Sequence, residues 1–149
     1  MGEQQRAAVA RQLNRAGRPE GTQTVATVLK SRVLIVEDDD QLRQIITRNL
    51  AARGHEVRQA ADASSALAVL AEELPDLLIL DVNLPDRTGW DVLREAHLPA
   101  EVRVLMLTAV PVSPRRLAEF RPVAYLPKPF PLEALLRLAE TSARTMHDE

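Results

Sequence analysis

The chain has 149 residues, 46% hydrophobic and 27% charged, a composition ordinary for one globular domain, and its net charge of −2 gives no reason to expect direct nucleic-acid binding. It contains no cysteine, which excludes disulfides, thiol catalysis and thiolate metal sites. No apolar stretch is long enough to span a membrane and the polar N-terminus lacks a secretory signal, so we expect a soluble cytoplasmic protein without membrane contact.

Residues 1–30 are expected to be an extension outside the domain. A helix-favouring segment rich in Ala, Gln and Arg (3–16) has Val9 and Leu13 as its only large apolar residues, and small and polar residues follow (17–30). We expect this extension to be partly helical or disordered, with a partner-docking helix or an Arg-rich targeting peptide as alternatives. Five basic residues against two acidic ones give it a charge of +3, so the remainder carries −5.

Four short apolar runs and one weaker run, separated by segments with helical periodicity, predict parallel strands, and the four apolar runs are expected to be buried. In chain order these runs are 32–36, 55–59, 76–80, 102–107 and 123–126. The second run is the poorest in apolar residues, which is typical of a sheet edge. Strands that alternate with helices in this way predict right-handed crossovers and an α/β fold, with a five-stranded parallel sheet covered by helices on both faces.

The first two intervening segments carry helix signals. The first helix is expected to begin at an N-cap of Asp39 or Asp40 and to end at Gly54. Its predicted buried face consists of Leu42, Ile45, Ile46 and Leu50. Asp62 is expected to cap the second helix, whose predicted buried residues are Ala66, Leu67 and Leu70.

The later helices are less regular in the sequence. A third helix is expected over about 88–97, after a loop that contains Pro85 and Gly89. Pro111 and Pro114 leave room for only a short or irregular fourth helix, from about 114 to 120. The last helix is expected to begin near residue 131, with a buried face of Leu132, Leu135, Leu136 and Ala139.

Polar residues follow four of the apolar runs. Glu37 and Asp38 come after the first, Asp81 after the third, Thr108 after the fourth, and Lys128 closely after the fifth. The carboxyl ends of the strands line the ligand crevice of an open α/β sheet, so these side chains are expected to converge. The expected site would contain three carboxylates, a hydroxyl and an ammonium. This set of groups is suited to an aspartate that accepts a phosphoryl group with the help of a divalent cation.

Asp81 is the candidate nucleophile, because a carboxylate can attack phosphorus and form a mixed anhydride. The charge of the attacked group must be neutralised, and Mg²⁺ suits this because it binds a few carboxylates together with phosphate oxygens. Glu37 and Asp38 can supply such a site, and the backbone carbonyl of Asn83 could complete it. The alternative for the acidic run 37–40 is a solvated helix cap.

Thr108 and Lys128 are open to two interpretations each. The Thr108 hydroxyl could bind a phosphate oxygen, although a Thr at a strand end is more often structural. The chain has two lysines against seventeen arginines, so a compact ammonium at Lys128 hints at a specific use, with a surface lysine as the alternative. Gly89 is either a tight-loop glycine or an ordinary turn residue, and Tyr125 taken alone would be core.

Four segments together closely resemble the receiver domains of two-component response regulators. They are residues 33–39 (VLIVEDD), 80–85 (LDVNLP), 107–109 (LTA) and 125–130 (YLPKPF). The resemblance covers residues 31–146, which leaves 147–149 as a C-terminal tail. It implies a flavodoxin-like sheet of order 2-1-3-4-5 and a signalling protein rather than an enzyme.

The resemblance also implies a site and a mechanism. Asp81 would take a phosphoryl group from a histidine kinase or a histidine phosphotransfer protein. The implied ligands of Mg²⁺ are Glu37, Asp38, Asp81 and the Asn83 backbone carbonyl. Lys128 would contact the phosphoryl group, Thr108 would move toward it, and Tyr125 would rotate inward as the second switch residue. The implied Lys128–Pro129 peptide bond is cis, which the sequence permits.

The partners that the resemblance implies are a histidine kinase or phosphotransfer protein and an unidentified output protein. The chain itself is expected to be a monomer or a phosphorylation-dependent dimer.

The sequence departs from the receiver pattern at two places. Glu37 replaces the aspartate often found there, and Arg121-Pro122 stands where the family usually has a glycine. Asn83 and Val110 are expected to tune self-hydrolysis of the phosphoryl group.

Three other functions are alternatives to this one. They are a phosphorylation-independent pseudo-receiver, a receiver fragment of a larger regulator or hybrid kinase, and an aspartyl-phosphate phosphatase. The phosphatase is disfavoured because Asn83 stands where such an enzyme would have a second carboxylate.

Overall fold

The structure is a computed structural model that describes residues 31–147, with side chains described as far as Glu140. The expected extension (1–30) and the last two residues of the expected tail lie outside the described residues. In chain order the elements are β1 (Arg32–Val36), α2 (Asp40–Ala52), β2 (Glu56–Ala60), α3 (Ala63–Glu72), β3 (Leu77–Asp81), α4 (Gly89–Ala96), β4 (Arg103–Thr108), α5 (Pro114–Phe120), β5 (Ala124–Pro127) and α6 (Leu132–His147). Among these helices, none combines the length and the apolar character that a membrane crossing requires.

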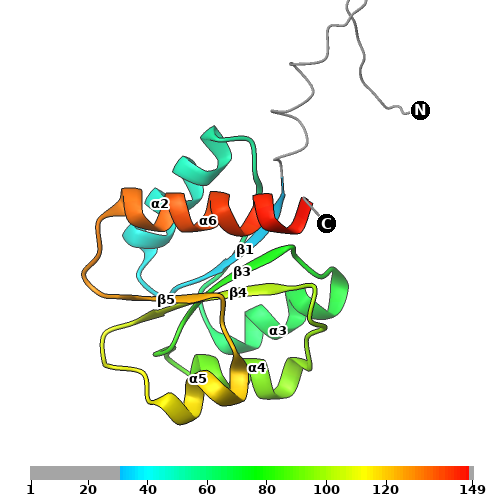
Figure 1. Ribbon diagram of the computed structural model, residues 1–149, viewed down its shortest axis with the longest axis vertical. Coiled ribbons are helices and arrows are strands. Elements are labelled where there is room, and N and C mark those ends of the chain that lie inside the picture. Colours follow the sequence, from blue (N-terminus) through cyan, green and yellow to red (C-terminus); the bar gives the residue numbers. More distant parts are fainter. Residues whose placement is uncertain (1–30, 148–149) are drawn as a thin grey trace, which may run out of the picture. The chain divides into compact units, whose positions relative to one another are not determined.

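The five strands form one parallel sheet of order β2-β1-β3-β4-β5, which confirms the expected α/β topology. Helices α2 and α6 cover one face of the sheet, and α3, α4 and α5 cover the other (Figure 1). The register aligns the carboxyl ends of neighbouring strands, since Val36 pairs with Leu80 and Thr108 pairs with Pro127. Residues that follow these strand ends are therefore delivered to one edge of the sheet.

The core consists of two apolar layers, one on each face of the sheet. All five residues of β3 are buried, as expected for the central strand of a sheet covered on both faces. On one face Ile46 and Leu50 of α2 pack with residues of α6, including Leu135. On the other face α3 and α4 supply the layer that includes Trp90. Burial on both faces explains why β1, β3 and β4 read as continuous apolar runs, whereas the edge strands β2 and β5 are more exposed, and the expected burial of β5 was wrong.

The predicted helix caps are present. Asp39 is the N-cap of α2 and accepts a hydrogen bond from the Leu42 amide, and Asp62 caps α3 in the same way. Gly54 has a positive φ of 95°, which suits a residue that ends a helix. The prediction that Ile45 is buried was wrong, because its side chain is 42% exposed.

The position of Ile45 has a geometric cause. Ile46 and Leu50 lie four residues apart in one row of α2 and are completely buried against the sheet. Ile45 lies one residue earlier, about 100° around a helix with 3.6 residues per turn, and so faces solvent. The apolar pattern of this helix is wider than the stripe that the sheet covers.

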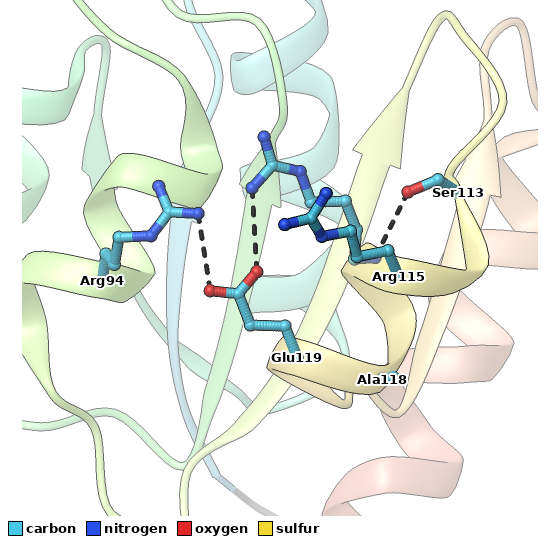
Figure 2. Close-up of a pocket in the computed structure, with 6 residues that line it drawn as sticks. Arg94, Ser113, Arg115, Ala118 and Glu119 are labelled. Atoms are coloured by element: carbon cyan, nitrogen blue, oxygen red, sulfur yellow. Dashed lines mark hydrogen bonds and ion pairs between the residues drawn. The ribbon is translucent and has the colours of Figure 1, made fainter.

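Helix α5 is short, as the prolines predicted, and contains no buried residue. It is attached to α4 by a stack of Phe120 on Trp90, with ring centroids 5.2 Å apart. Glu119 lies between two arginines, 3.4 Å from Arg94 and 3.8 Å from Arg116. Figure 2 shows this ion pair of Arg94 and Glu119 across a hollow between α4 and α5. The hollow is lined by Arg94, Ser113, Arg115, Arg116, Ala118 and Glu119.

The end of α5 explains a departure noted in the sequence. Arg121 has a φ of 50° and occupies the left-handed conformation at the C-cap. Glycine adopts this conformation without the steric cost that a Cβ imposes. Arg121 therefore adopts, at some conformational cost, the left-handed backbone conformation for which the family usually has a glycine.

Candidate functional site

Three carboxylates meet at the carboxyl edge of the sheet. Oxygens of Glu37, Asp38 and Asp81 lie within 4.8 Å of one another. Glu37 and Asp38 directly follow β1, and Asp81 is the last residue of the adjacent strand β3. Glu37 is completely buried and Asp81 is 3% exposed, whereas Asp38 faces solvent. The cluster is thus open on the Asp38 side.

Lys128 extends into this cluster from the end of β5. Its ammonium donates hydrogen bonds to Glu37 Oε1 and Asp81 Oδ2, each at 2.8 Å. Its backbone amide donates to the carbonyl of Thr108 at 2.7 Å, and its peptide bond to Pro129 is cis. Lys128 therefore joins Glu37, which is 91 residues away in the chain, to Asp81, which is 47 residues away.

Burial and pairing oppose each other in this cluster. Burial raises the pKa of Glu37 to about 7, against the hydrogen bonds from Lys128 and from the Asp39 amide, which lower it. Burial alone would lower the pKa of Lys128, but its hydrogen bonds to Asp81 and Glu37 outweigh this and raise the pKa above its usual value. Lys128 is therefore a fixed positive charge that offsets only part of the acidic charge around it.

The donor atoms of this site fit a magnesium ion. The three carboxylates offer hard oxygen ligands, and these suit Mg²⁺ better than metals that prefer thiolate or imidazole. Their charge when ionised exceeds that of Lys128 by two, which a divalent cation would neutralise. Asn83 is next to the cluster, since its backbone amide donates to Asp81 Oδ1 at 3.1 Å.

Thr108 and Tyr125, the two expected switch residues, do not contact Asp81 by any hydrogen bond described. Thr108 ends β4 and is 1% exposed, and its hydroxyl donates to the Val110 carbonyl at 2.6 Å. The same hydroxyl accepts a hydrogen bond from the Val110 amide at 3.1 Å. Tyr125 on β5 is 41% exposed. Thr108 is thus bonded to its own loop, and the Tyr125 ring faces outward.

Arg43 is a residue of this site that sequence reasoning missed. Its guanidinium is largely buried, with 11% of the side chain exposed. It donates to the backbone carbonyl of Glu37 at 2.8 Å and to the side chain of Gln59 at 3.0 Å, and it pairs with Asp40. The fork of an arginine supplies all three contacts at once. The sequence signal for this role was the position of Arg43, a basic residue about one helical turn after the acidic run 37–40.

The structure also decides between the two interpretations of Gly89. A Cβ at this position would lie 2.5 Å from the backbone oxygen of Asp81 and 3.1 Å from Cγ of Leu80. The amide of Gly89 donates to the carbonyl of Val82 at 2.7 Å. A glycine is needed here because the start of α4 packs directly against the backbone of Asp81.

Comparison with known proteins agrees with this fold. The model of the response regulator receiver domain matches residues 33–140. The chain is 38% identical over 122 residues to the response regulator MprA of Mycobacterium sp. (strain KMS), which covers 79% of this chain and 53% of that protein.

Two solved structures are similar throughout the described domain. A CheY-like response regulator receiver domain protein from Methanospirillum hungatei JF-1 has a TM-score of 0.72 and 29% identity, covering 78% of this chain and 96% of that one. The chemotaxis response regulator CheY4 of Vibrio cholerae has a TM-score of 0.68 and 31% identity, covering 76% and 98%.

The five-stranded parallel sheet of order β2-β1-β3-β4-β5 and the matches to known proteins define one class of protein. The chain belongs to the family of response regulator receiver domains of two-component systems, which are signalling domains and not classical enzymes. The family expected from the four sequence segments is thus confirmed. The chain spans about half the length of the curated relatives that it matches.

Proposed function

We propose that the domain, residues 31–146, is a phosphorylation-dependent receiver in which Asp81 accepts a phosphoryl group from a histidine kinase or a histidine phosphotransfer protein. The observation that carries the proposal is the position of Lys128, whose ammonium lies 2.8 Å from both Asp81 and Glu37. An ammonium next to the candidate nucleophile is suited to hold an anionic group that is attached to it.

In the proposed step an Asp81 carboxylate oxygen attacks the phosphorus of a phosphohistidine. An O–P bond forms as the P–N bond breaks, and the imidazole nitrogen leaves with the electron pair and takes a proton from solvent. Glu37, Asp38, Asp81 and the Asn83 backbone carbonyl would hold Mg²⁺, which when bound neutralises charge on the phosphoryl oxygens. Burial of Asp81 and Glu37 strengthens these electrostatic interactions.

The same proposal accounts for signalling by a shift between two packings. Phosphoryl oxygens offer acceptors to the Lys128 ammonium and to the Thr108 hydroxyl, which would then leave its bond with the Val110 carbonyl. Movement of Thr108 would make room for the exposed Tyr125 ring to turn inward and change the surface presented to an output protein. Differential contacts of about 1–3 kcal/mol would change partner affinity roughly 5–150-fold.

Beryllofluoride with Mg²⁺ tests the proposal, because it mimics a phosphoryl group on an aspartate. Trp90 is the single tryptophan and directly follows Gly89, which packs on the Asp81 backbone, so its fluorescence is a local reporter. We expect saturable quenching or enhancement in the wild type and none in Asp81→Asn. Phosphotransfer from a panel of kinases should label the wild type and not Asp81→Ala. Equal labelling of both would place the phosphoryl group on a residue other than Asp81 and refute the proposal. No labelling of the wild type and no adduct on Asp81 would favour the pseudo-receiver.

The length of the curated relatives raises the question whether this receiver domain is part of a larger protein. The curated relatives are about twice as long as the aligned part, since 53% of the MprA sequence is covered. We propose that the domain works either alone or as the receiver of a larger regulator or hybrid kinase. Sequencing the gene with its neighbourhood decides this: an adjoining output or kinase domain in the same reading frame establishes the larger regulator.

A further inference from the structure

The loop that follows β3 is tied to helix α3 by one side chain. Asp86 Oδ1 accepts a hydrogen bond from the backbone amide of Ala63 at 2.9 Å, and its Oδ2 accepts one from Ser64 at 3.0 Å. These amides belong to the first turn of α3, whose N–H groups have no partner within the helix. The Ala63 amide, the largest cause, and its neighbours lower the pKa of Asp86 below its usual value. The tie is therefore made by an ionised carboxylate at neutral pH.

The same helix end has a second carboxylate with a different attachment. Asp62 is the N-cap of α3 and accepts a hydrogen bond from the Ser65 amide at 2.7 Å. Asp62 immediately precedes the helix that it caps, so its bond is local. Asp86 comes from 22 and 23 residues further along the chain, in the loop that carries Asn83. Only Asp86 of the two connects α3 to the site.

A short chain of backbone contacts leads from Asp86 to the acidic cluster. At its base the loop is closed by the bond from Gly89 to Val82, and Asn83 forms an isolated antiparallel bridge with Thr88. The Asn83 amide in turn donates to Asp81 Oδ1. The base is thus fixed to β3 by backbone bonds, while the tip of the loop is fixed to α3 by Asp86.

We propose that Asp86 is a positioning residue for the metal site, which holds the loop of Asn83 in the shape that binds the cation. This inference rests on the proposed function, because it assumes that Mg²⁺ binds beside Asp81. A loop fixed at both ends loses less freedom when its carbonyl coordinates an ion, so binding is stronger. Coupling of this kind is reciprocal: bound Mg²⁺ strengthens the bonds of Asp86 to Ala63 and Ser64.

The test compares Asp86→Asn with Asp62→Asn in the full chain. Each change preserves size and removes a negative charge from the N-terminus of α3. In Asp86→Asn the amide also offers only one oxygen to the two backbone amides that the carboxylate binds, whereas the single bond of Asp62 can be kept by asparagine. Mg²⁺ alone is titrated by calorimetry, and stability is measured by urea unfolding. We expect Asp86→Asn to weaken Mg²⁺ binding about tenfold, the lower range for residues that orient metal ligands. Asp62→Asn should lower stability only slightly, through the lost charge at the helix N-terminus, and leave the Mg²⁺ affinity within about twofold of wild type.

Equal Mg²⁺ affinities of the two variants would overturn the inference, since Asp86 would then be only a helix cap. A second readout is hydrogen exchange of the Ala63 and Ser64 amides by NMR, with and without Mg²⁺. Exchange should slow on Mg²⁺ addition in the wild type and in Asp62→Asn, and unchanged rates in the wild type count against the coupling.

Asp81→Asn separates the two proposals. Mg²⁺ binding that is lost in Asp81→Asn and unchanged in Asp86→Asn refutes only the role of Asp86. A wild-type chain that binds no Mg²⁺ refutes the metal site and with it the inference.

Discussion

The ammonium of Lys128 lies 2.8 Å from Oδ2 of Asp81, although 47 residues separate them. It makes a second bond of the same length to Glu37. An ammonium has three donors, so one remains for an incoming phosphoryl oxygen. A planar guanidinium directs its donors in a fixed fork and could not replace this compact charge between two carboxylates. This geometry gives a physical reason for a lysine in a chain that otherwise uses arginine for nearly all its basic residues.

Lys128→Arg and Lys128→Ala are therefore both expected to slow phosphorylation of Asp81, by roughly 100-fold, the order seen when one electrostatic donor is removed from a reacting centre. Mg²⁺ affinity should not weaken in Lys128→Ala, because a cation that competes for the same carboxylates is removed. Labelling by phosphoramidate and calorimetric Mg²⁺ titration measure the two effects. A wild-type rate in Lys128→Arg would show that charge alone suffices.

Gly89→Ala is expected to destabilise the domain by about 1–3 kcal/mol, as overpacking does, because its Cβ would meet the Asp81 oxygen at 2.5 Å. The backbone of Asp81 must shift, so Mg²⁺ binding should weaken as well. Gly54→Ala is the matched control: its φ of 95° makes alanine unfavourable, but nothing lies within 4 Å of the added Cβ. Urea unfolding should show a loss in both variants, and calorimetry a loss of Mg²⁺ affinity in Gly89→Ala alone.

His55 is expected to make stability depend on pH. It is buried, its Nδ1 lies 2.9 Å from the Ser31 hydroxyl, and burial lowers its pKa, opposed by Glu140 and assisted by Arg53. The unfolded chain takes up a proton near pH 6.5 while native His55 stays neutral, so stability is lost as pH falls from 6.5 toward the native pKa. The slope is limited to about 1.4 kcal/mol per pH unit.

His55→Gln removes this titration and keeps a polar side chain. Urea unfolding between pH 7.5 and 5 should show wild type losing stability relative to this variant, with His97→Asn at an exposed site as the control. Glu37 titrates in both proteins, so its contribution cancels when the unfolding free energy of His55→Gln is subtracted from that of the wild type. A stability difference between wild type and His55→Gln that stays constant over this range would contradict the assignment.

Thr47→Val is expected to stabilise the domain. The Thr47 hydroxyl is buried in α2 and has no hydrogen-bond partner among the described residues, and leaving such a group unpaired costs about 1–3 kcal/mol. Valine keeps the shape and removes the polar atom, so a gain of about 1 kcal/mol in unfolding free energy is expected. Thr47→Ser keeps the hydroxyl, loses a methyl group and should destabilise. Urea unfolding distinguishes the two, and a loss of stability in Thr47→Val would show that the hydroxyl has a partner, such as water.

Local features of the fold could be predicted because they depend on residues close together in the chain. The sequence predicted all five strands to within one residue at each end, and it predicted Asp39 or Asp40 as the first helix cap and Asp62 as the second from their positions before helical segments. Pro111 and Pro114 predicted a short α5 because proline limits where a helix can begin and continue. Ile45 was misassigned because periodicity identifies an apolar face but not how much of it a neighbour covers.

The alternation of strands and helices, and the polar residues at the strand ends, follow from the order of residues in the chain, because burial and capping act over a few residues. The folded chain was needed to show that Lys128 bridges Glu37 and Asp81, that Arg43 binds the Glu37 backbone, and that Asp86 reaches the start of α3. These contacts depend on sheet register and loop path, which join residues distant in sequence. No local pattern encodes distances of that kind.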